Sequence, residues 1–259
     1  SGNQLTELEV GSNTALMSLY CGGNPLTSLN VSKNTALTTL SCTNNSLTKL
    51  DVSDLTELTE LTCSGNPLTS LDVSQNHKLE TLYCSSCALT SLDLSGTNVT
   101  GLSAAYNSYD ITLTDGTFDL DELSEFGFKA SKATDWTGGT VDEDGILTLN
   151  SGETKVTYKY DCENGHSVIF TLDATPKYTV TVGGIYHSHF GNEPGETFTL
   201  DYAAGERVTL EIGKREGYTL KDLTLSGIDE EQLKWNAKDV ETDQRAIGFT
   251  MPANDVTIR

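Results

Sequence analysis

Four short stretches of the sequence bring together side chains that could do chemistry. They are Cys84-Ser-Ser-Cys87, which matches Cys-x-x-Cys, His187-Ser-His189, Asp142-Glu-Asp-Gly145 and Asp161-Cys-Glu-Asn-Gly-His166. In principle these could supply a redox or zinc pair, two imidazoles on one face of a strand, carboxylates for calcium, and a thiol beside a general base.

None of the four has the partners that its chemistry needs. A Cys-x-x-Cys site wants a helix N-terminus or a second ligand pair, whereas Cys84 lies in a repeated position. The histidine pair has no third ligand at an evident spacing and is followed by a Gly/Pro-rich loop, 191–195. The acidic stretch 142–145 is better explained as a turn, and the thiol and imidazole of 161–166 fall across a hairpin turn. With no phosphate-binding Gly loop or Gly-x-Ser-x-Gly elbow, we expect no enzyme, no catalytic residue, no metal ligand and no cofactor.

The segment that positions Cys84 repeats every 21 residues. The four copies are Leu16-Met-Ser-Leu-Tyr-Cys21, Leu37-Thr-Thr-Leu-Ser-Cys42, Leu58-Thr-Glu-Leu-Thr-Cys63 and Leu79-Glu-Thr-Leu-Tyr-Cys84. The second Leu and the Cys are two apart, so both face inward in an extended strand. Stacked coils then share a continuous core. This predicts a leucine-rich solenoid of about four and a half coils without helices, in a mainly β protein.

Each coil carries a second pattern on its opposite side, as in Leu47-Thr-Lys-Leu-Asp-Val52, which we also interpret as β-like. Asparagines form two columns, one of Asn24, Asn45 and Asn66 and one of Asn13, Asn34 and Asn76, where buried amides can bond the backbone. Leu55 and Thr97 interrupt the second column and Cys87 the first, so we expect the ladder to be weakest at Cys87. The other repeat cysteines are interpreted as small buried hydrophobes, and a largely thiol state in an exported protein would indicate a reducing setting.

The 21-residue form with Cys in the strand and Leu-Asp-Val-Ser opposite resembles the short-coil leucine-rich repeats of bacterial cell-surface proteins. The resemblance covers residues 5 to about 105. It implies an extracellular scaffold for adhesive or protein–protein contacts and implies no catalytic residue.

The repeat fails near residue 103, and the composition then predicts two further β-rich regions. We expect a solenoid at 1–109, a capping domain at 110–176 and a small all-β module at 177–259. The capping domain should contain a strand near 111–114, a short acidic helix around 120–126, a strand at 146–149 and a hairpin turned by Asn164-Gly165. Its segments 129–139 and 158–165 together look like a module that follows such repeats in other bacterial surface proteins, with Trp136 in the core rather than serving as a sugar platform. Thr175-Pro-Lys177 is expected to be a linker, and 178–258 resembles an adhesin- and internalin-type repeat module that acts mostly as a spacer.

The formal net charge is -21, which disfavours nucleic acid and anionic lipid as partners, and solubility alone is the simpler explanation of the charge. No run of 18 apolar residues exists, so we expect no membrane insertion. Ser1-Gly-Asn-Gln4 has no basic or apolar leader, and the chain stops within a strand-like run. We expect a monomeric piece of an exported bacterial surface protein, without its signal peptide or any wall anchor.

Two faces of the solenoid could bind a partner. The face beside the Cys column carries Ser18, Tyr20, Thr39, Ser41, Glu60, Thr62, Thr81 and Tyr83, and the opposite face carries Glu9, Asn30, Asp51, Asp72 and Asp93. Tyrosine contributes area and a hydroxyl at modest entropic cost, so we take Tyr20, Ser41, Thr62, Tyr83 and Glu60 as the candidate binding residues for a protein or glycan at the cell surface. The alternatives are a structural stalk that presents another domain and a non-catalytic accessory region of a secreted carbohydrate-active enzyme.

Overall fold

The computed structural model describes residues 1–114, 116–183, 197–203, 207–212, 225–226, 234–235, 245–250 and 256–258, with side chains described up to residue 175 and at Val208 and Val256. The chain forms two compact units, one of Ser1–Ile111 with Thr117–Ala174 and one of Thr112–Gly116 with Thr175–Arg259. The solenoid and most of the region expected to cap it therefore lie in one unit. The sequence-based boundaries at 109/110 and 176/177 stay predictions.

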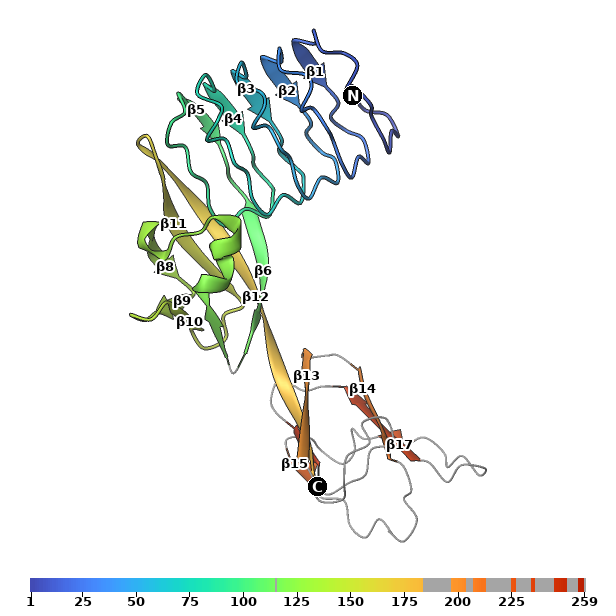
Figure 1. Ribbon diagram of the computed structural model, residues 1–259. Helices are drawn as coiled ribbons and strands as arrows, with labels where there is room; N and C mark the ends of the chain where they lie inside the picture. Colours follow the sequence, from blue (N-terminus) through green and yellow to red (C-terminus); the bar gives the residue numbers. More distant parts are fainter. Residues whose placement is uncertain are drawn as a thin grey trace. The chain divides into compact units, whose positions relative to one another are not determined.

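The solenoid is a stack of coils whose strands form a five-stranded parallel sheet in chain order (Figure 1). Its strands are β1 (Ser18–Tyr20), β2 (Thr39–Ser41), β3 (Glu60–Thr62), β4 (Thr81–Tyr83) and β5 (Gly101–Ser103). In register, Leu40 and Leu61 are neighbours at the centre of the sheet, and both are fully buried. The fold is thus mainly β with a leucine-rich solenoid, as predicted.

Only one side of each coil is a strand, which corrects the expectation of β structure on both sides. The segment that includes Leu47–Val52 is assigned no strand. It leads instead into consecutive tight turns, in which Leu55 N–H donates to Val52 O and Leu58 N–H donates to Leu55 O, both at 3.0 Å. These turns use the backbone groups within the coil, so they cannot form a ladder between coils.

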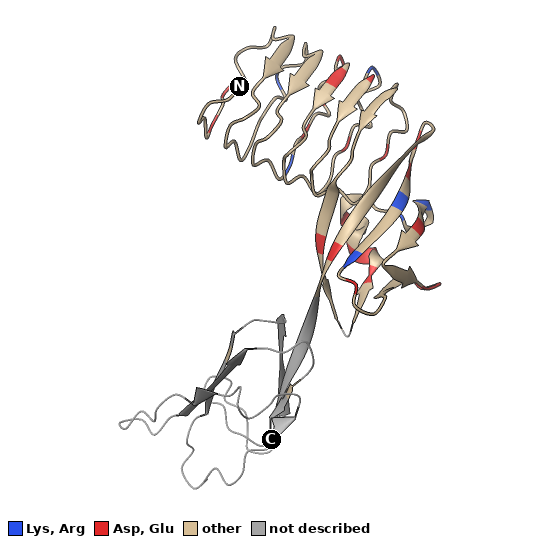
Figure 2. Ribbon diagram, turned by 180° about the vertical axis from the view of Figure 1, so that it is seen from behind, with Lys and Arg blue, Asp and Glu red and all other residues tan. Residues whose placement is uncertain are grey.

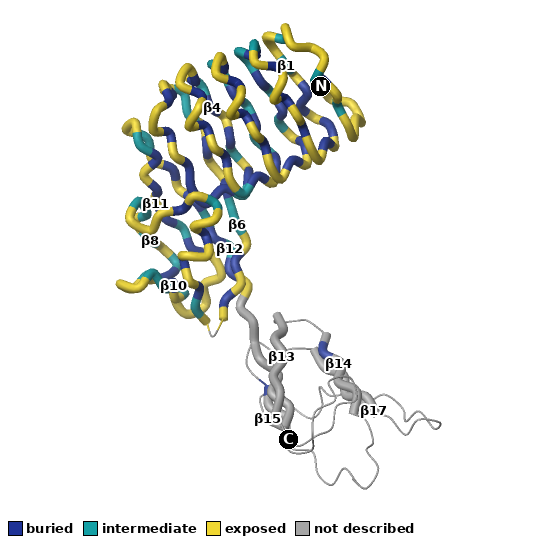
Figure 3. Tube along the Cα trace, in the orientation of Figure 1, coloured by how far each residue is buried: buried dark blue, intermediate teal, exposed yellow. Residues whose placement is uncertain are grey.

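The inward-pointing leucines, valines and cysteines form a continuous core along the coils (Figure 3). All six cysteines are free and buried. Burial raises the pKa of Cys42 and Cys162 to about 12, so these thiols stay protonated near neutral pH and pack as small hydrophobes.

The first asparagine column satisfies backbone groups of two adjacent coils. Asn66 Nδ2 donates to Cys42 O at 3.0 Å and to Cys63 O at 2.8 Å, and its Oδ1 accepts from Leu47 N–H at 3.1 Å. At the interruption, the Cys87 thiol lies 3.7 Å from Cys63 O, in the place of the first of these bonds.

Below the solenoid, the first unit contains short antiparallel strands and two 3₁₀ helices (Figure 1). These elements are β6 (Asn107–Leu113), β7 (Thr117–Asp119), η1 (Leu120–Phe126), η2 (Ala130–Lys132), β8 (Ala133–Thr137), β9 (Gly139–Val141), β10 (Ile146–Leu149), β11 (Lys155–Glu163) and β12 (His166–Gly183). β10 pairs with β7 and β9, and β11 pairs with β8 and β12. The expected acidic helix is η1, which the Asp119 carboxylate begins by accepting the Asp121 N–H and which ends at Gly127 with φ 86°.

The predicted hairpin is β11–β12, and its turn is confirmed by positive φ at Asn164 (51°) and Gly165 (77°). Residues 175–177, expected to be a linker, lie within β12 at the point where the chain passes from the first unit to the second. β12 pairs with β11 up to Asp173 and with β13 from Lys177, so Pro176 stands between the two registers, where a missing N–H does little harm.

The second unit is described only in part, as the C-terminal half of β12 with six further strands. These are β13 (Thr197–Ala203), β14 (Arg207–Ile212), β15 (Leu225–Ser226), β16 (Lys234–Trp235), β17 (Arg245–Thr250) and β18 (Val256–Ile258). β12 pairs antiparallel with β13 and parallel with β18, and β17 pairs with β14 and β16. The strand expected at 207–212 is β14, whereas His187 and His189 lie outside the described residues.

Candidate functional site

The solvent face of the five-stranded sheet holds the candidate binding residues in two rows. The parallel register places Tyr20, Ser41, Thr62, Tyr83 and Ser103 in one row and Ser18, Thr39, Glu60, Thr81 and Gly101 in the next. These rows follow from the pattern Leu-x-Cys, because the residue between two inward side chains must point outward.

The two tyrosines are the large side chains of the first row. Tyr20 is 61% exposed and Tyr83 is 41% exposed, whereas Ser41, Thr62 and Glu60 are half-buried. Tyr20 and Tyr83 lie three strands apart, which corresponds to about 14 Å at the usual spacing between strands. They therefore bracket a shelf of small hydroxyls rather than stacking into one cluster.

This shelf is held by a rigid backbone. Cys42 N–H donates to Thr62 O at 2.9 Å and Cys63 N–H donates to Tyr83 O at 2.8 Å, so each coil is bonded to the next beside the candidate residues. A partner would meet side chains on an ordered sheet, with little backbone ordering to be done on binding.

One exposed aromatic residue was missed by reasoning from the sequence. Tyr106 is 85% exposed and has φ 60°, at the coil position where Gly23, Gly65 and Ser86 also have positive φ. The repeat alignment contained the relevant clue, since the equivalent residues in earlier coils are Gly, Asn, Gly and Ser, types that tolerate this conformation better than an aromatic residue does.

The opposite face is explained by local structure. Asp51, Asp72 and Asp93 each accept the N–H of the serine two residues later, at 2.8–3.0 Å, and Asn30 makes the same bond with Ser32. The pKa of Asp51 is lowered first by the Ser53 hydroxyl, which donates to its Oδ1 at 2.7 Å, and then by the Ser53 N–H. The acidic column thus holds turns and does not by itself indicate a ligand.

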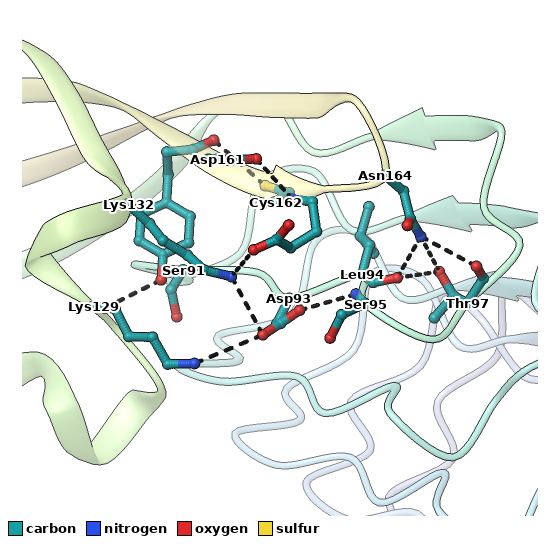
Figure 4. A network of polar contacts seen from close by, with 12 residues as sticks. Ser91, Asp93, Leu94, Ser95, Thr97, Lys129, Lys132, Asp161, Cys162 and Asn164 are labelled. Carbon is teal, nitrogen blue, oxygen red and sulfur yellow. Dashed lines mark hydrogen bonds and ion pairs between the residues drawn. The ribbon is translucent and has the colours of Figure 1, made fainter.

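Asp93 also joins the solenoid to the region below it. Its carboxylate lies 3.5 Å from Lys132 Nζ and 4.0 Å from Lys129 Nζ, and Lys132 also reaches Glu163 at 2.7 Å (Figure 4). Acidic residues are otherwise spread over both the solenoid and the strands below it (Figure 2).

The turn of the β11–β12 hairpin takes the place of a further coil. Asn76 Nδ2 donates to Val52 O and Leu55 O, both at 2.9 Å, across one coil interface. At the end of the solenoid, Asn164 Nδ2 donates to the equivalent carbonyls of Leu94 (2.6 Å) and Thr97 (3.1 Å) (Figure 4). The hairpin therefore supplies the amide that the next coil would have supplied.

This docking covers the last leucines of the solenoid, since Leu89, Leu92 and Leu94 are buried. Tyr158 Oη donates to Thr90 O at 2.5 Å, and Leu94 N–H donates to Cys162 O at 2.9 Å.

The remaining chemical candidates have structural partners. Cys162 is buried with its thiol 3.7 Å from Tyr160 O, whereas His166 Nε2 lies 3.0 Å from Val99 O. Asp142 Oδ1 accepts the N–H groups of Asp144 and Ile146, as expected for a turn between β9 and β10.

Trp136 stacks on Tyr158 with ring centroids 4.6 Å apart, in an aromatic cluster of the first unit.

Among the described residues, no group of three or more His, Cys, Asp or Glu side chains could hold a metal ion. No helix in the described part of the chain is long and apolar enough to span a membrane.

Comparison with solved structures shows a structural likeness, whereas comparison of the sequence with families and curated proteins shows none. No protein-family model matches this chain, and no curated protein matches it. A solved structure described as the functional domain of InlJ from Listeria monocytogenes, which includes a cysteine ladder, is 28% identical to it. The alignment has a TM-score of 0.38 and covers 67% of this chain and 51% of that chain, so this chain spans about half the length of the InlJ structure.

Proposed function

We propose that the solvent face of β1–β5 is a non-catalytic binding surface of an exported bacterial surface protein, and that it holds a protein or glycan in an adhesin-like manner. The observation that carries the proposal is the row in which exposed Tyr20 and Tyr83 bracket Ser41 and Thr62 on a hydrogen-bonded sheet. Glu60 stands beside Thr62 in the neighbouring row and adds one carboxylate acceptor.

The spacing of the row suits an extended or ring-shaped partner. Two aromatic faces about 14 Å apart can each contact an apolar face of a sugar ring or a peptide side chain, while the hydroxyls between them donate and accept hydrogen bonds. Tyrosine and small hydroxyl residues together are typical of surfaces that bind by shape and hydrogen bonds without chemistry.

The experiment is a binding screen of the whole chain against host matrix proteins and a glycan panel. The Tyr20→Ala/Tyr83→Ala double variant tests the row, and Tyr106→Ala is the matched control, because it removes an exposed tyrosine outside the row. Melting temperatures of both variants should equal that of the wild-type chain, since the three side chains are exposed.

A partner lost by the double variant and kept by Tyr106→Ala supports the proposed site. A partner lost only by Tyr106→Ala moves the site to the end of the solenoid and overturns the assignment of the row. If no partner in the panel binds the wild-type chain, the result favours a structural stalk or an accessory region and counts against an adhesin-like function.

A further inference from the structure

Cys87 brings a second thiol to the interface between two coils. Cys63 and Cys84 take the inward position directly after β3 and β4, and Cys87 stands where the preceding coils have an asparagine. The Cys87 thiol lies 3.7 Å from Cys63 O and is hydrogen-bonded to the Cys63 thiol. The two thiols that meet in space therefore come from adjacent coils, whereas the Cys-x-x-Cys spacing of the sequence pairs Cys87 with Cys84.

The surroundings of the Cys87 sulfur suit a hydrogen-bond acceptor. At the same position of the preceding coil, Asn66 Oδ1 accepts the Leu47 N–H at 3.1 Å. The corresponding donor beside Cys87 is the N–H of Leu68, and the N–H groups of Asn66 and Gly65 also act on its sulfur. Donors that bond the charged form of a group favour that form. The repeat thus places backbone donors where a thiolate needs them.

These contacts make the two thiols of the pair unequal. The hydrogen bond from Cys63 lowers the pKa of Cys87, burial opposes this effect, and the backbone N–H groups add to the lowering. The same hydrogen bond and then burial raise the pKa of Cys63. Cys87 is also the most exposed of the six cysteines, at 6% against 3% or less for the others. Because the thiolate is the nucleophile, Cys87 is the member of the pair that reacts first.

We infer that Cys87 and Cys63 form a redox-sensitive pair, in which a hydroperoxide oxidises Cys87 and Cys63 then closes a disulfide between two coils. The Cys87 thiolate attacks one peroxide oxygen, the O–O bond breaks, and the other oxygen takes a proton and leaves as water, so that Cys87 becomes a sulfenic acid. The Cys63 sulfur attacks the Cys87 sulfur, the S–O bond breaks, and hydroxide leaves as water with the Cys63 proton. The two thiols lose two electrons, which the peroxide takes up.

The disulfide forms at the one position of the first asparagine column that a cysteine occupies. There the thiol contact of Cys87 with Cys63 O stands where the preceding coil has the amide bonds of Asn66. Oxidation replaces this contact by a covalent bond between the coil of β3 and the coil of β4. A peroxide in the surroundings of the protein would thus cross-link the solenoid at this interface.

The test treats the whole reduced chain with hydrogen peroxide near neutral pH, blocks the remaining thiols and digests the protein with trypsin in the absence of reductant. Cleavage after lysine separates the fragments 50–78 and 79–129. A Cys63–Cys87 disulfide joins these two fragments, whereas a Cys84–Cys87 disulfide stays within 79–129. Cys84→Ala is the matched control, because it removes the neighbouring cysteine and keeps the pair, and Cys87→Ala removes the pair. Alkylation rates of the thiols are measured in the native chain and in urea.

The expected result is that the two fragments are joined in the wild-type chain and in Cys84→Ala, and that they are separate in Cys87→Ala. In the native reduced chain, Cys87 should be alkylated at least about tenfold faster than Cys162, and this difference should vanish in urea, since it depends on the fold. The inference is overturned if the fragments of the wild-type chain stay separate, if they are still joined in Cys87→Ala, or if native Cys87 reacts no faster than Cys162.

Discussion

Replacing Cys87 by Asn should stabilise the solenoid, because it restores the interrupted asparagine column. In the two preceding coils Asn45 and Asn66 each use Nδ2 to bond the carbonyls of two coils and Oδ1 to accept a leucine N–H. Cys87 offers a thiol 3.7 Å from Cys63 O, and Leu68 N–H turns instead to Asn66 O at 2.8 Å. A thiol contact thus stands at Cys87 where the other coils have amide bonds, and that the column is weakest there stays a prediction.

The gain can be bounded from these contacts. An amide replaces a weak thiol donor, and the Leu68 N–H exchanges one carbonyl for another, so the net gain is that of about one hydrogen bond, about 1 kcal/mol. For a protein of this size that corresponds to a rise in melting temperature of about 2–4 °C. The larger side chain fits the same place in the neighbouring coils, which limits the cost of added volume.

The assay is thermal and urea unfolding under reducing conditions, so that no thiol oxidises during the scan. Cys87→Ala is the control, since it removes the thiol donor without supplying an amide, and it should not stabilise the protein. If Cys87→Asn is no more stable than Cys87→Ala, the amide bonds of this column do not contribute to stability as argued here.

Four further substitutions test other parts of the first unit. Leu61→Ala should lower the free energy of unfolding, measured in urea, by about 2–5 kcal/mol. Leu19→Ala should lower it by less than half as much, because Leu19 is only half-buried. Equal losses would mean that Leu19 is covered in solution. Asn164→Gly keeps a residue that favours positive φ but removes the bonds to Leu94 O and Thr97 O, so it should cost about 1–2 kcal/mol, and a neutral effect would show that the turn alone anchors the hairpin. The pKa of Asp93 lies below its ordinary value of 3.8, chiefly through the Ser95 bonds and then through Lys132, so its contribution to stability is present above that value and is lost as pH falls through the folded pKa. Asp93→Asn keeps the turn, as Asn30 does. Its free energy of unfolding should therefore fall less steeply than that of the wild-type chain between about pH 5 and pH 2, where a carboxylate takes up its proton. Equal acid profiles of the two proteins would contradict this.

The solenoid was predictable because its core positions recur at a fixed spacing. Leu19, Leu40, Leu61 and Leu82 were identified as strand centres from the repeat alone, and they occupy β1–β4. β5 was not expected as a strand, because Ala104 replaces the cysteine and the register with β4 moves by 20 residues instead of 21. Asn107, the first residue of β6, nevertheless continues the asparagine column by donating to Cys84 O at 3.1 Å and Ala104 O at 2.8 Å.

Below the solenoid, the sequence was informative only where local rules decide the structure. The hairpin turn at Asn164-Gly165 and the helix η1 follow from residues adjacent in the chain. β7 and β8 are short segments without an alternating apolar pattern, and they are strands because they pair with β10 and β11, which lie about 20 or more residues further along the chain. The hydrogen bonds by which Asn164 replaces a coil asparagine could not be predicted either, because Asn164 bonds Leu94 O, 70 residues away along the chain.

Within each strand of the solenoid, inward and outward residues are under different constraints. Inward residues are restricted to Leu and Cys by packing, and turn residues are restricted to types that accept positive φ, but the outward residue of each strand is free of both constraints. In the row of Tyr20, Ser41, Thr62, Tyr83 and Ser103, the fold therefore explains the direction of each side chain without requiring its identity. Tyr106 makes the same point more strongly, because an aromatic residue at φ 60° with 85% exposure gains little from packing and adopts a backbone conformation that glycine would adopt at lower cost. The fold alone therefore does not require the exposed tyrosines Tyr20, Tyr83 and Tyr106.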